Sequence, residues 1–522
     1  MSLAVRDSSG RKGRELHTTT ARPAATRLAT YPNPVLALPT TPATRTTCAS
    51  CLRTDFDTPV TPCSACRAAY YCSKACQRLS WNRVHRQECP ALRAVPAGRE
   101  LPTPVRALLQ VVVRKDAWHE VSRLEGNEGG FRAEAGRWGD LRLQGEMVRR
   151  VLGRDPEWVG GGDVVGKYAA AMCKLLTNMF NVHDPDFNYD AVFLDTSLAM
   201  ANHSCVPNAS VHIYGRTAIL VSDRAIAKDE EITISYTNPS YPLAQRRQDL
   251  AKYHFECTCP RCADDLSPYA AAALHPLPEM DSFSLARLPH DKVPSVPGGT
   301  SLQAEIYEKL APLQGDPTRA RLRQEYRICE PLIGFGQWAS LAPFLEECLG
   351  YYLTRGPVEA LLITALSACR AHPITHTPFS PYRLKGALAV VRALSSATAD
   401  PAHYKSRIAS IADTTGAAGA VDVDLLIDVD PIAMSRMVLY MINFYLPVTQ
   451  EESWPLAVQA RQALAEIKEY SSWGEGGARE GMERWEGGER DAEWMAVWRR
   501  MVGLVDGFAE LGARLIVADF GA

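Results

Sequence analysis

The chain has 522 residues, more than one hydrophobic core usually supports, so about two to four domains are expected. Its hydrophobic share of 46% is ordinary for a soluble protein, and no uninterrupted apolar run is long enough to cross a bilayer. The formal charge of −2 argues against a protein that binds polyanions with its whole surface, although local basic patches remain compatible with it.

Cysteine usage indicates metal sites. Of the 15 cysteines, 11 fall into metal-ligand spacings between positions 48 and 262. Thiolate zinc sites together with unpaired cysteines suit a reducing compartment, and no secretory hydrophobic region is present. We therefore expect a protein of the nucleus, the cytoplasm or both.

The first 46 residues are rich in Arg, Ser and Thr and poor in acidic residues. This composition is also typical of a mitochondrial presequence, which stays open as an alternative. Within it, residues 10–16 read GRKGREL, and an ordinary basic turn between two edge strands is one interpretation of that stretch.

Eight soft or borderline ligands follow, enough for two tetrahedral zinc ions. They are Cys48, Cys51, Cys63, Cys66, Cys72, Cys76, His85 and Cys89. His85 and Cys89 stand four residues apart, so on a helix that begins near Ser73 or Leu79 they share one face. A segment this small cannot bury an adequate core, so the metals would supply its folding free energy.

The same segment carries basic side chains, namely Arg67, Lys74, Arg78, Arg83 and Arg86. Gln77 with Trp81 could form an exposed groove for a proline-rich peptide. A solvated basic face is the plainer interpretation, and direct DNA contact is a further one.

Apolar spacing predicts helices over three stretches of the next hundred residues: 101–113, 146–152 and 164–180. A loop rich in Gly and Glu follows the first. Gly160-Gly161-Gly162 is no phosphate loop, because no Gly-Lys-Ser/Thr follows it, and it predicts a flexible turn. Asn178 is a candidate helix C-cap, and residues 193–200 are expected to be a buried segment that leads into the next motif.

Beyond position 200, three short motifs carry the candidate chemistry. They are ANHSCVPN at 201–208, EEITISY at 230–236 and YHFECTCPRC at 253–262. Residues 217–221 and 232–236 are rich in β-branched side chains and predict strands, with a polar turn between them at 228–230.

The third motif predicts another metal site. Cys257, Cys259 and Cys262 are too close in sequence to complete a four-coordinate thiolate site, and Cys205 is the obvious fourth donor. Such a site would gather Tyr236, Tyr253 and Phe255 around one cavity; the alternative is that these aromatic residues are only core.

These motifs resemble the SET domain of protein lysine methyltransferases with its post-SET zinc site, and together with the upstream zinc pattern they resemble the SET and MYND (SMYD) family. The resemblance covers residues 5–265, about half the chain. It implies an α+β fold in which a MYND double-zinc finger and a helical insert split the SET β-fold, followed by a post-SET zinc site and an all-α C-terminal helical array.

The domain organisation that the resemblance implies is as follows. Residues 1–46 form the N-terminal part of the SET domain, 47–90 the MYND finger, 91–190 the helical insert, 191–248 the core SET region, 249–265 the post-SET segment, 266–300 a linker and 301–522 the helical C-terminal domain.

The resemblance also implies how three zinc ions are held. Interleaved pairing places Cys48, Cys51, Cys72 and Cys76 on one ion and Cys63, Cys66, His85 and Cys89 on another. A third, structural ion is held by Cys205, Cys257, Cys259 and Cys262.

S-adenosylmethionine is the cofactor that the resemblance implies, with contacts from Lys12, Arg14, Asn178, Asn202, His203, Tyr236 and Phe255. Asn202 and His203 would bind the adenine end chiefly through backbone groups, in a segment threaded beneath the strand that ends in Tyr236; a lone histidine is more often structural. Glu15 stands where the family has glycine, so a backbone with positive φ would be strained there.

The implied reaction is methyl transfer from a sulfonium to a lysine amine, which requires an oriented, neutral amine. An unperturbed lysine has a pKa of about 10.4, so desolvation and the cofactor's positive charge must help to release its proton to water. Tyr236 would align the amine and the methyl group, and Tyr253 would form the second wall of the lysine channel. Aromatic faces tolerate methylammonium products.

A Pro-rich link from 276 to 299 precedes eight predicted helices: 301–313, 319–333, 338–354, 358–370, 382–396, 431–445, 455–472 and 490–517. Successive antiparallel helices favour a solenoid-like array, although no tetratricopeptide signature is present. Residues 474–490 are expected to be a disordered loop.

The sequence thus predicts a monomeric protein-lysine N-methyltransferase that acts on a histone or another protein, without membrane association. An enzyme silent on histones and directed at one cytosolic partner differs from it only in substrate. The alternative of another class is a catalytically idle scaffold or transcriptional co-regulator that binds peptides through its finger, which Glu15 favours.

Overall fold

The computed structural model describes residues 3–8, 13–54, 59–96, 98–183, 189–239, 241–266, 270–271, 274, 299–313, 315–334, 336–370, 380–417, 419–449, 455–470 and 492–521. Lys12, the Pro-rich link up to residue 298 and the predicted loop at 474–490 lie outside the described residues. The chain folds as two compact units: Met1–Tyr236 with Leu250–Glu256, and Thr237–Asp249 with Cys257–Ala522. No helix in the described part of the chain is long and apolar enough to span a bilayer.

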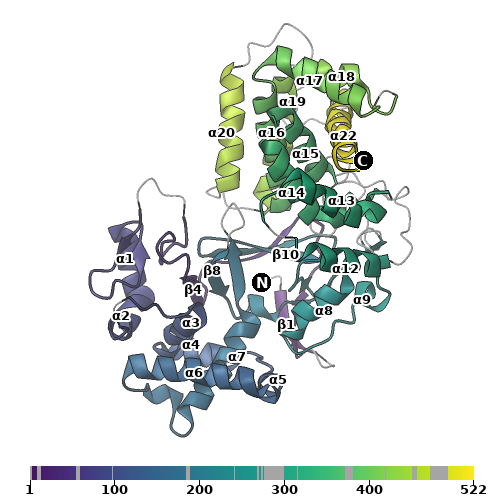
Figure 1. Ribbon diagram of the computed structural model, residues 1–522. Coiled ribbons are helices and arrows are strands. Elements are labelled where there is room, and N and C mark those ends of the chain that lie inside the picture. The colour runs from purple at the N-terminus through teal and green to yellow at the C-terminus, as the bar shows by residue number, and fades with distance from the viewer. Residues whose placement is uncertain are drawn as a thin grey trace. The chain divides into compact units, whose positions relative to one another are not determined.

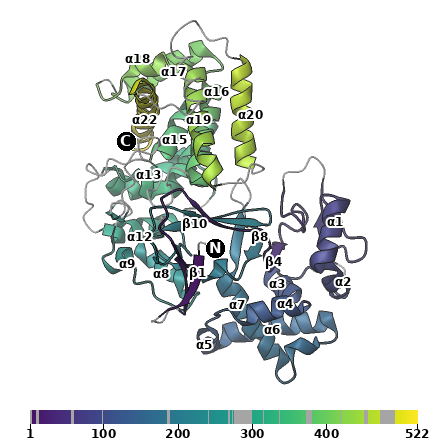
Figure 2. The same ribbon diagram turned by 180° about the vertical axis from the view of Figure 1, so that it is seen from behind.

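Small sheets form the β-part of the first unit (Figures 1 and 2). One is the antiparallel pair β1 (Leu3–Asp7) and β2 (Arg14–Thr18). A second has the order β10 (Ala209–Tyr214), β11 (Thr217–Ser222), β3 (Arg27–Tyr31), and a third the order β4 (Leu36–Pro39), β8 (Tyr189–Leu194), β7 (Phe180–His183).

The strand predicted at 217–221 is confirmed as β11. It lies in the middle of its sheet, where Leu220 pairs with Val211 of β10 and Ala29 of β3. A middle strand has hydrogen-bonded neighbours along both edges, and the side chains of Ala218 to Val221 are also buried.

The first two motifs beyond position 200 meet in a short parallel pair, β9 (Asn202–His203) with β12 (Thr233–Ile234). The backbone N–H of Ser204 extends this pairing by donating to the carbonyl of Ile234 at 2.9 Å. β12 is shorter than the strand predicted at 232–236, and the polar turn predicted at 228–230 is present, with Asp229 at φ 65°.

We call the stretch with the eight ligands from Cys48 to Cys89 the metal-ligand segment. It contains the strands β5 (Thr61–Pro62) and β6 (Tyr70–Tyr71), α1 (Lys74–Ser80), a π-helical turn (Trp81–His85) and the first part of α2 (Arg86–Arg93). The helix predicted from Ser73 is confirmed, because the Ser73 hydroxyl caps α1 by accepting from the Cys76 N–H at 3.1 Å. The buried segment predicted at 193–200 is confirmed in part: Phe193, Leu194, Leu198 and Met200 are buried in β8 and a 3-10 turn at Leu198–Met200, whereas Ser197 is exposed.

Helices connect the metal-ligand segment to β7. They are α3 (Thr103–Val112), α4 (Lys115–Ser122), α5 (Glu128–Ala133), α6 (Ala135–Leu152) and α7 (Val164–Asn178). The three predicted helical stretches are present. The loop predicted after the first of them is wrong, because α4 and α5 occupy much of it.

Tertiary packing explains the missed helix α5. Its Phe131 is buried at 1% exposure, whereas the helix itself is short and contains two glycines, so local propensity alone does not favour it. The turn predicted at Gly160–Gly162 is confirmed: Gly160 and Gly162 have φ values of 75° and 87°, which glycine adopts without steric cost.

The core of the first unit lies where α3 and α7 pack with β4 and β8. α3 is buried from Val105 to Val112, including Arg106 and Gln110. A helix that is apolar nearly all round indicates a position inside a core rather than on a surface.

The second unit is helical over most of its described residues. It contains α9 (Pro260–Ala263), α12 (Gly299–Leu310), α13 (Arg319–Gly334), α14 (Ala342–Leu353), α15 (Pro357–Cys369), α16 (Pro381–Ala397), α17 (Pro401–Thr414), α18 (Val423–Ile427), α19 (Pro431–Thr449), α20 (Pro455–Tyr470) and α22 (Ala492–Phe520). Helix α8 (Leu243–Ala251) precedes α9. All eight helices predicted beyond residue 300 have counterparts.

Helices α17 and α18 were not predicted, although both carry start signals. The carboxylates of Asp400 and Asp422 cap their first turns by accepting backbone N–H groups, and Pro401 stands at the first position of α17. Helix α15 is the centre of the second unit: it contacts α14, α16 and α22 and is buried along nearly its whole length.

Candidate functional site

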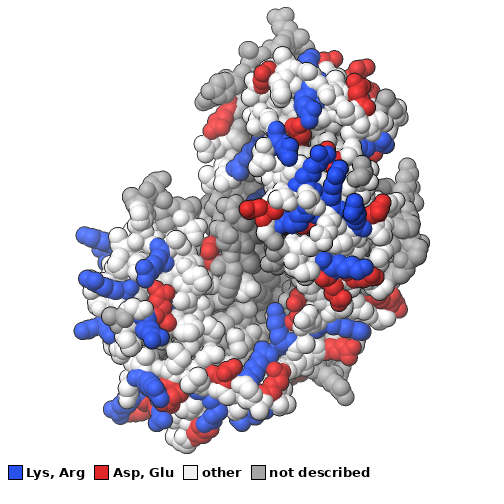
Figure 3. Space-filling model, viewed as in Figure 1, with Lys and Arg blue, Asp and Glu red and all other residues white. Residues whose placement is uncertain are grey.

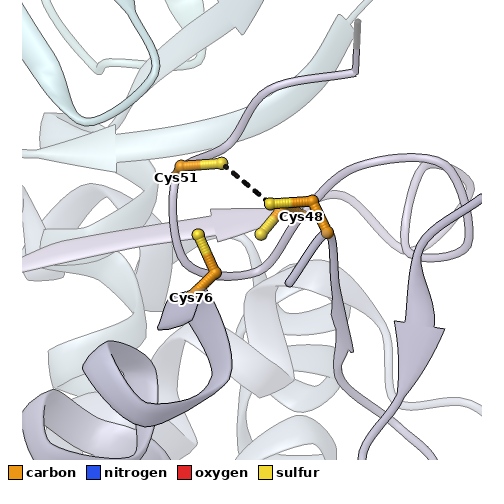
Figure 4. Close-up of side chains that lie close together, drawn as sticks. Cys48, Cys51 and Cys76 are labelled. Atoms are coloured by element: carbon orange, nitrogen blue, oxygen red, sulfur yellow. Dashed lines mark hydrogen bonds between the residues drawn. The ribbon is translucent and has the colours of Figure 1, made fainter. Parts of the chain in front are cut away.

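The first group of ligands lies in the metal-ligand segment. Its sulfur atoms lie within 4.8 Å of one another and come from Cys48, Cys51, Cys72 and Cys76. Figure 4 shows the labelled Cys48, Cys51 and Cys76 with their sulfur atoms turned toward one another. Four soft donors at this separation fit a tetrahedral zinc ion.

The second group has four donor atoms within 4.8 Å of one another, from Cys63, Cys66, His85 and Cys89. The geometry thus groups the eight ligands in the interleaved manner that the family resemblance implied. The π-helical turn that ends at His85 and the following helix α2 carry the last two donors, as the helical spacing predicted.

Glu88 orients the histidine of this second group, a role that sequence reasoning missed. Its Oε1 lies 2.9 Å from Nδ1 of His85, and its Oε2 accepts from the Gln110 side chain at 3.0 Å. Burial raises the pKa of Glu88, but the hydrogen bond with His85 and the charge of Arg106 outweigh burial and lower it. An ionised Glu88 accepts the proton on Nδ1 of His85 and so leaves Nε2 free for a metal. The sequence signal for this role was an acidic residue three positions after the ligand His85.

The third group consists of Cys205, Cys257, Cys259 and Cys262, whose sulfur atoms also lie within 4.8 Å of one another. Nε2 of His203 is 3.3 Å from Sγ of Cys205, and the buried guanidinium of Arg246 is 3.7 Å from Sγ of Cys262. Four thiolates on one divalent ion leave net negative charge, which a guanidinium contact offsets.

Three of the predicted site residues, Tyr236, Tyr253 and Phe255, form a group of aromatic rings in the first unit. The centroid of Tyr236 is 5.2 Å from that of Tyr253 and 6.3 Å from that of Phe255. His203 joins them at 5.3 Å from Tyr236 and 5.9 Å from Phe255. Phe255 is 37% exposed, and the two tyrosines are half-buried. We call Tyr236, Tyr253 and Phe255 the aromatic group.

The hydroxyl of Tyr236 is held in one place. It donates to the carbonyl of Ala201 at 2.7 Å, while the Tyr236 N–H donates to Nδ1 of His203 at 2.9 Å. Burial, with the nearby charges of Tyr253 and Glu231, raises the pKa of Tyr236 above its ordinary value. The phenol therefore stays neutral near pH 7 and keeps its proton.

His203 is engaged on both ring nitrogens, with the Tyr236 N–H and with Cys205. This supports the structural role that a lone histidine more often has. Asn202 donates its side-chain amide to Oε1 of Glu231 at 2.9 Å and to the carbonyl of Arg14 at 3.2 Å. Glu231 was not singled out from the sequence.

Two further predicted cofactor residues of the first unit, Arg14 and Asn178, donate to backbone carbonyls. Arg14 donates to the carbonyl of Arg123 at 2.5 Å. Asn178 is the last residue of α7, and its amide donates to the carbonyls of Glu125 and Lys174, both at 2.7 Å. Its bond to Lys174 resembles the helix-terminal role weighed from the sequence.

The condition for strain at Glu15, a positive φ, is not met. Glu15 lies in the extended backbone of β2, and its Oε2 is 3.0 Å from Nε2 of His17. The left-handed conformation falls two positions earlier, on Gly13 at φ 74°, where it costs little.

Exposed basic side chains cover the metal-ligand segment, as predicted. Figure 3 shows Lys and Arg over α1, the π-helical turn and α2, where Lys74, Arg78, Arg83 and Arg86 are exposed. Trp81 is 41% exposed beside them.

Comparisons with known proteins agree with this site. Residues 48–89 match the family model of the MYND finger. The chain is 33% identical over 236 residues to SET domain and MYND-type zinc finger protein 6 of Schizosaccharomyces pombe, covering 44% of this chain and 46% of the relative. It is 30% identical over 217 residues to histone-lysine N-methyltransferase SMYD3 of Mus musculus, covering 38% and 48%.

A third relative is N-lysine methyltransferase SMYD2-B of Danio rerio, 28% identical over 218 residues, which are 38% of this chain and 47% of the relative. The matches thus span about half the length of these curated relatives. The chain carries a MYND finger and is related to the SET and MYND domain-containing protein family.

Proposed function

We propose that the protein is an S-adenosylmethionine-dependent protein-lysine N-methyltransferase that acts on lysines of a histone or another protein. The observation that carries this proposal is the aromatic group with the fixed hydroxyl of Tyr236, which lies beside Asn202 and His203 on the parallel pair β9–β12. Relatives named as histone-lysine and N-lysine methyltransferases support it.

The cofactor would be held by backbone groups of Asn202 and His203, by Arg14 and Asn178, and by the ring of Phe255; Lys12 belongs to the same proposed set. S-adenosylmethionine supplies a methyl group on a sulfonium, so no electrophilic metal is needed at the reacting atoms. The residues fit this cofactor, because His203 of β9 lies beside Tyr236 and Phe255, and the ring of Phe255 is exposed.

The chain's own residues then have to orient the amine and keep water away from it. The faces of Tyr236 and Tyr253 form apolar walls that accept a methylammonium product. Because the Tyr236 hydroxyl is anchored on Ala201, its oxygen has a fixed position at which it can accept from the amine and align the lone pair. Desolvation between the rings favours the neutral amine.

The three ligand groups fit structural zinc, since each offers four soft donors and leaves no open coordination position. We further propose a monomer located in the nucleus, the cytoplasm or both. Proline-rich peptides at Gln77 and Trp81 are proposed as partners of the finger, ahead of direct DNA contact.

Replacing Tyr236 by phenylalanine tests the proposal. The ring packing remains, so we expect a folded protein, whereas loss of the aligned hydroxyl slows methyl transfer by about 10²-fold. The measurement is transfer of labelled methyl groups from S-adenosylmethionine to core histones and to a cell lysate. Tyr31→Phe, which removes another half-buried hydroxyl, is the control and should leave the rate unchanged.

Undiminished transfer by Tyr236→Phe contradicts the assigned role of the hydroxyl. Calorimetry with S-adenosylmethionine separates the enzyme from the idle scaffold, because the scaffold shows no binding. Glu15, the feature that favoured the scaffold, lies in unstrained backbone.

A further inference from the structure

Helix α5 packs against the loop that carries two members of the aromatic group. The amide of Asn127, directly before α5, donates to the carbonyl of Tyr253 at 2.6 Å. The ring of Phe131 meets the ring of His254 edge-on, with centroids 4.6 Å apart. Glu134, directly after α5, has Oε1 at 3.7 Å from Nδ1 of His254. The loop is therefore held at three points along one short helix.

The fit between helix and loop leaves no space for another carbon atom at Gly130. A Cβ added there would lie 2.5 Å from Cγ and 2.9 Å from Cβ of His254, both at the base of the side chain. His254 cannot make room by rotating its ring alone, because its own Cβ is too close. At the neighbouring Gly129, an added Cβ would meet nothing within 4 Å.

The loop conformation does not come from its own preferences. His254 has a left-handed backbone with φ 58°, which is uncommon for a residue other than glycine. Its Nε2 is buried and has no hydrogen-bond partner within the part of the chain that the structure describes. Such features persist where surrounding contacts impose them, and α5 supplies these contacts.

We infer that α5 is the positioning element of the aromatic group, and that the absence of a side chain at Gly130 sets where Tyr253 and Phe255 stand relative to Tyr236. This inference rests on the proposed function, because it assigns the glycine-containing helix the task of setting the width of the lysine channel. Gly130 is a positioning residue that acts through His254.

The matched pair Gly130→Ala and Gly129→Ala tests the inference. Both substitutions gain helix propensity equally, so they differ only in the contact with His254. For Gly130→Ala we expect kcat/KM for methylation of core histones to fall about tenfold or more, because the walls shift by a fraction of an ångström or more. Gly129→Ala should behave as the wild type, and zinc content should be unchanged in both.

Hydrogen exchange measured by mass spectrometry supplies a readout that does not depend on activity. Gly130→Ala should raise exchange in residues 250–256, whereas Gly129→Ala should not. Equal exchange and equal kinetics in the two variants would overturn the inference. If the wild type neither binds S-adenosylmethionine nor labels any protein, the proposed function fails, while the exchange data still decide whether α5 holds the loop.

A variant that lacks the His254 side chain shows whether Gly130→Ala acts through His254 or only by disturbing the fold. His254→Gly removes the atoms that clash and suits a positive φ, so adding Gly130→Ala to it should cause little further loss of kcat/KM. If Gly130→Ala is equally harmful in both backgrounds, its effect does not pass through His254 and the inference is wrong.

Discussion

At the scale of single residues, Asp223 is the most informative ionisable group outside the proposed site. Its Oδ1 accepts from the Ser210 hydroxyl at 2.8 Å, and Ser210 also lies 3.0 Å from Nε2 of His212. Burial raises the pKa of Asp223 to about 7, against the lowering effect of the Ser210 bond. Burial also lowers the pKa of His212 to about 4.

The shift at Asp223 makes stability depend on pH. Its folded pKa of about 7 exceeds the ordinary value of 3.8, so the folded state binds the proton more tightly than the unfolded chain. The contribution of Asp223 to stability therefore falls as pH rises from about 4 to about 7, and its full cost is present above that range. His212 contributes in the opposite direction, because its lowered pKa costs stability as pH falls below its ordinary value. Asp223→Asn should raise the free energy of unfolding by about 1–2 kcal/mol at pH 8 and leave it nearly unchanged at pH 4.

Urea unfolding at pH 4, 6 and 8 measures this difference. The exposed Asp140→Asn is the control, since it should change stability little at any pH. A gain at Asp223→Asn that is the same at all three pH values would show that the carboxyl group is not protonated in the folded state.

At the scale of elements, the MYND finger is joined to the core through α2 and α3. Glu88 of α2 contacts the ligand His85 and also Gln110 of the buried helix α3. The carboxylate thus connects a metal ligand with a helix of the core cluster. Zinc binding and packing against α3 support each other through this one side chain.

Glu88→Ala should speed zinc release from the finger by about 10- to 100-fold, because His85 loses the partner that fixes its ring orientation. Release into a chromogenic chelator gives the rate. Glu100→Ala removes a half-exposed carboxylate that pairs with the exposed Arg45, and should release zinc as the wild type does. Identical release from Glu88→Ala would mean that His85 needs no support from Glu88.

At the scale of the whole molecule, the proposed cofactor residues that the structure describes all belong to one of the two units. The unit Met1–Tyr236 with Leu250–Glu256 contains Arg14, Asn178, Asn202, His203, Tyr236 and Phe255. A ligand stabilises only those opening reactions that destroy its site. The second unit can then keep its own stability when the cofactor binds.

Saturating S-adenosylmethionine should therefore slow hydrogen exchange in the first unit and leave α16 and α17 of the second unit unchanged. At 100 times the dissociation constant the expected stabilisation is about 2.7 kcal/mol. Mass spectrometry of the exchanged peptides locates the effect, with adenosine triphosphate as the control ligand. Protection centred on α16 and α17 would place the binding site outside the proposed one.

Local chemistry was sufficient to predict the metal ligands and most helices. Cysteine and histidine spacing predicted eleven of the twelve clustered donors, because soft donors repeated at short spacing are typical of zinc sites, and the need for a fourth donor pointed to Cys205. Periodic apolar residues predicted the helices of the second unit for a similar reason, since each helix buries one of its own faces. Helix α5 carried no such local signal, and Glu88 carried only a weak one, an acidic residue three positions after His85.

The sequence by itself determined the twelve candidate zinc ligands and the helical nature of the second half, whereas their grouping into three sets came from the family resemblance and the structure. Only the tertiary structure decided which ring stands beside which, that Glu88 reaches His85 and Gln110 together, and that Gly130 lies against His254. The physical reason is that spacing and periodicity describe neighbours along the chain. Contacts between residues more than a hundred positions apart, such as Asn127 with Tyr253, arise only when the whole core is packed.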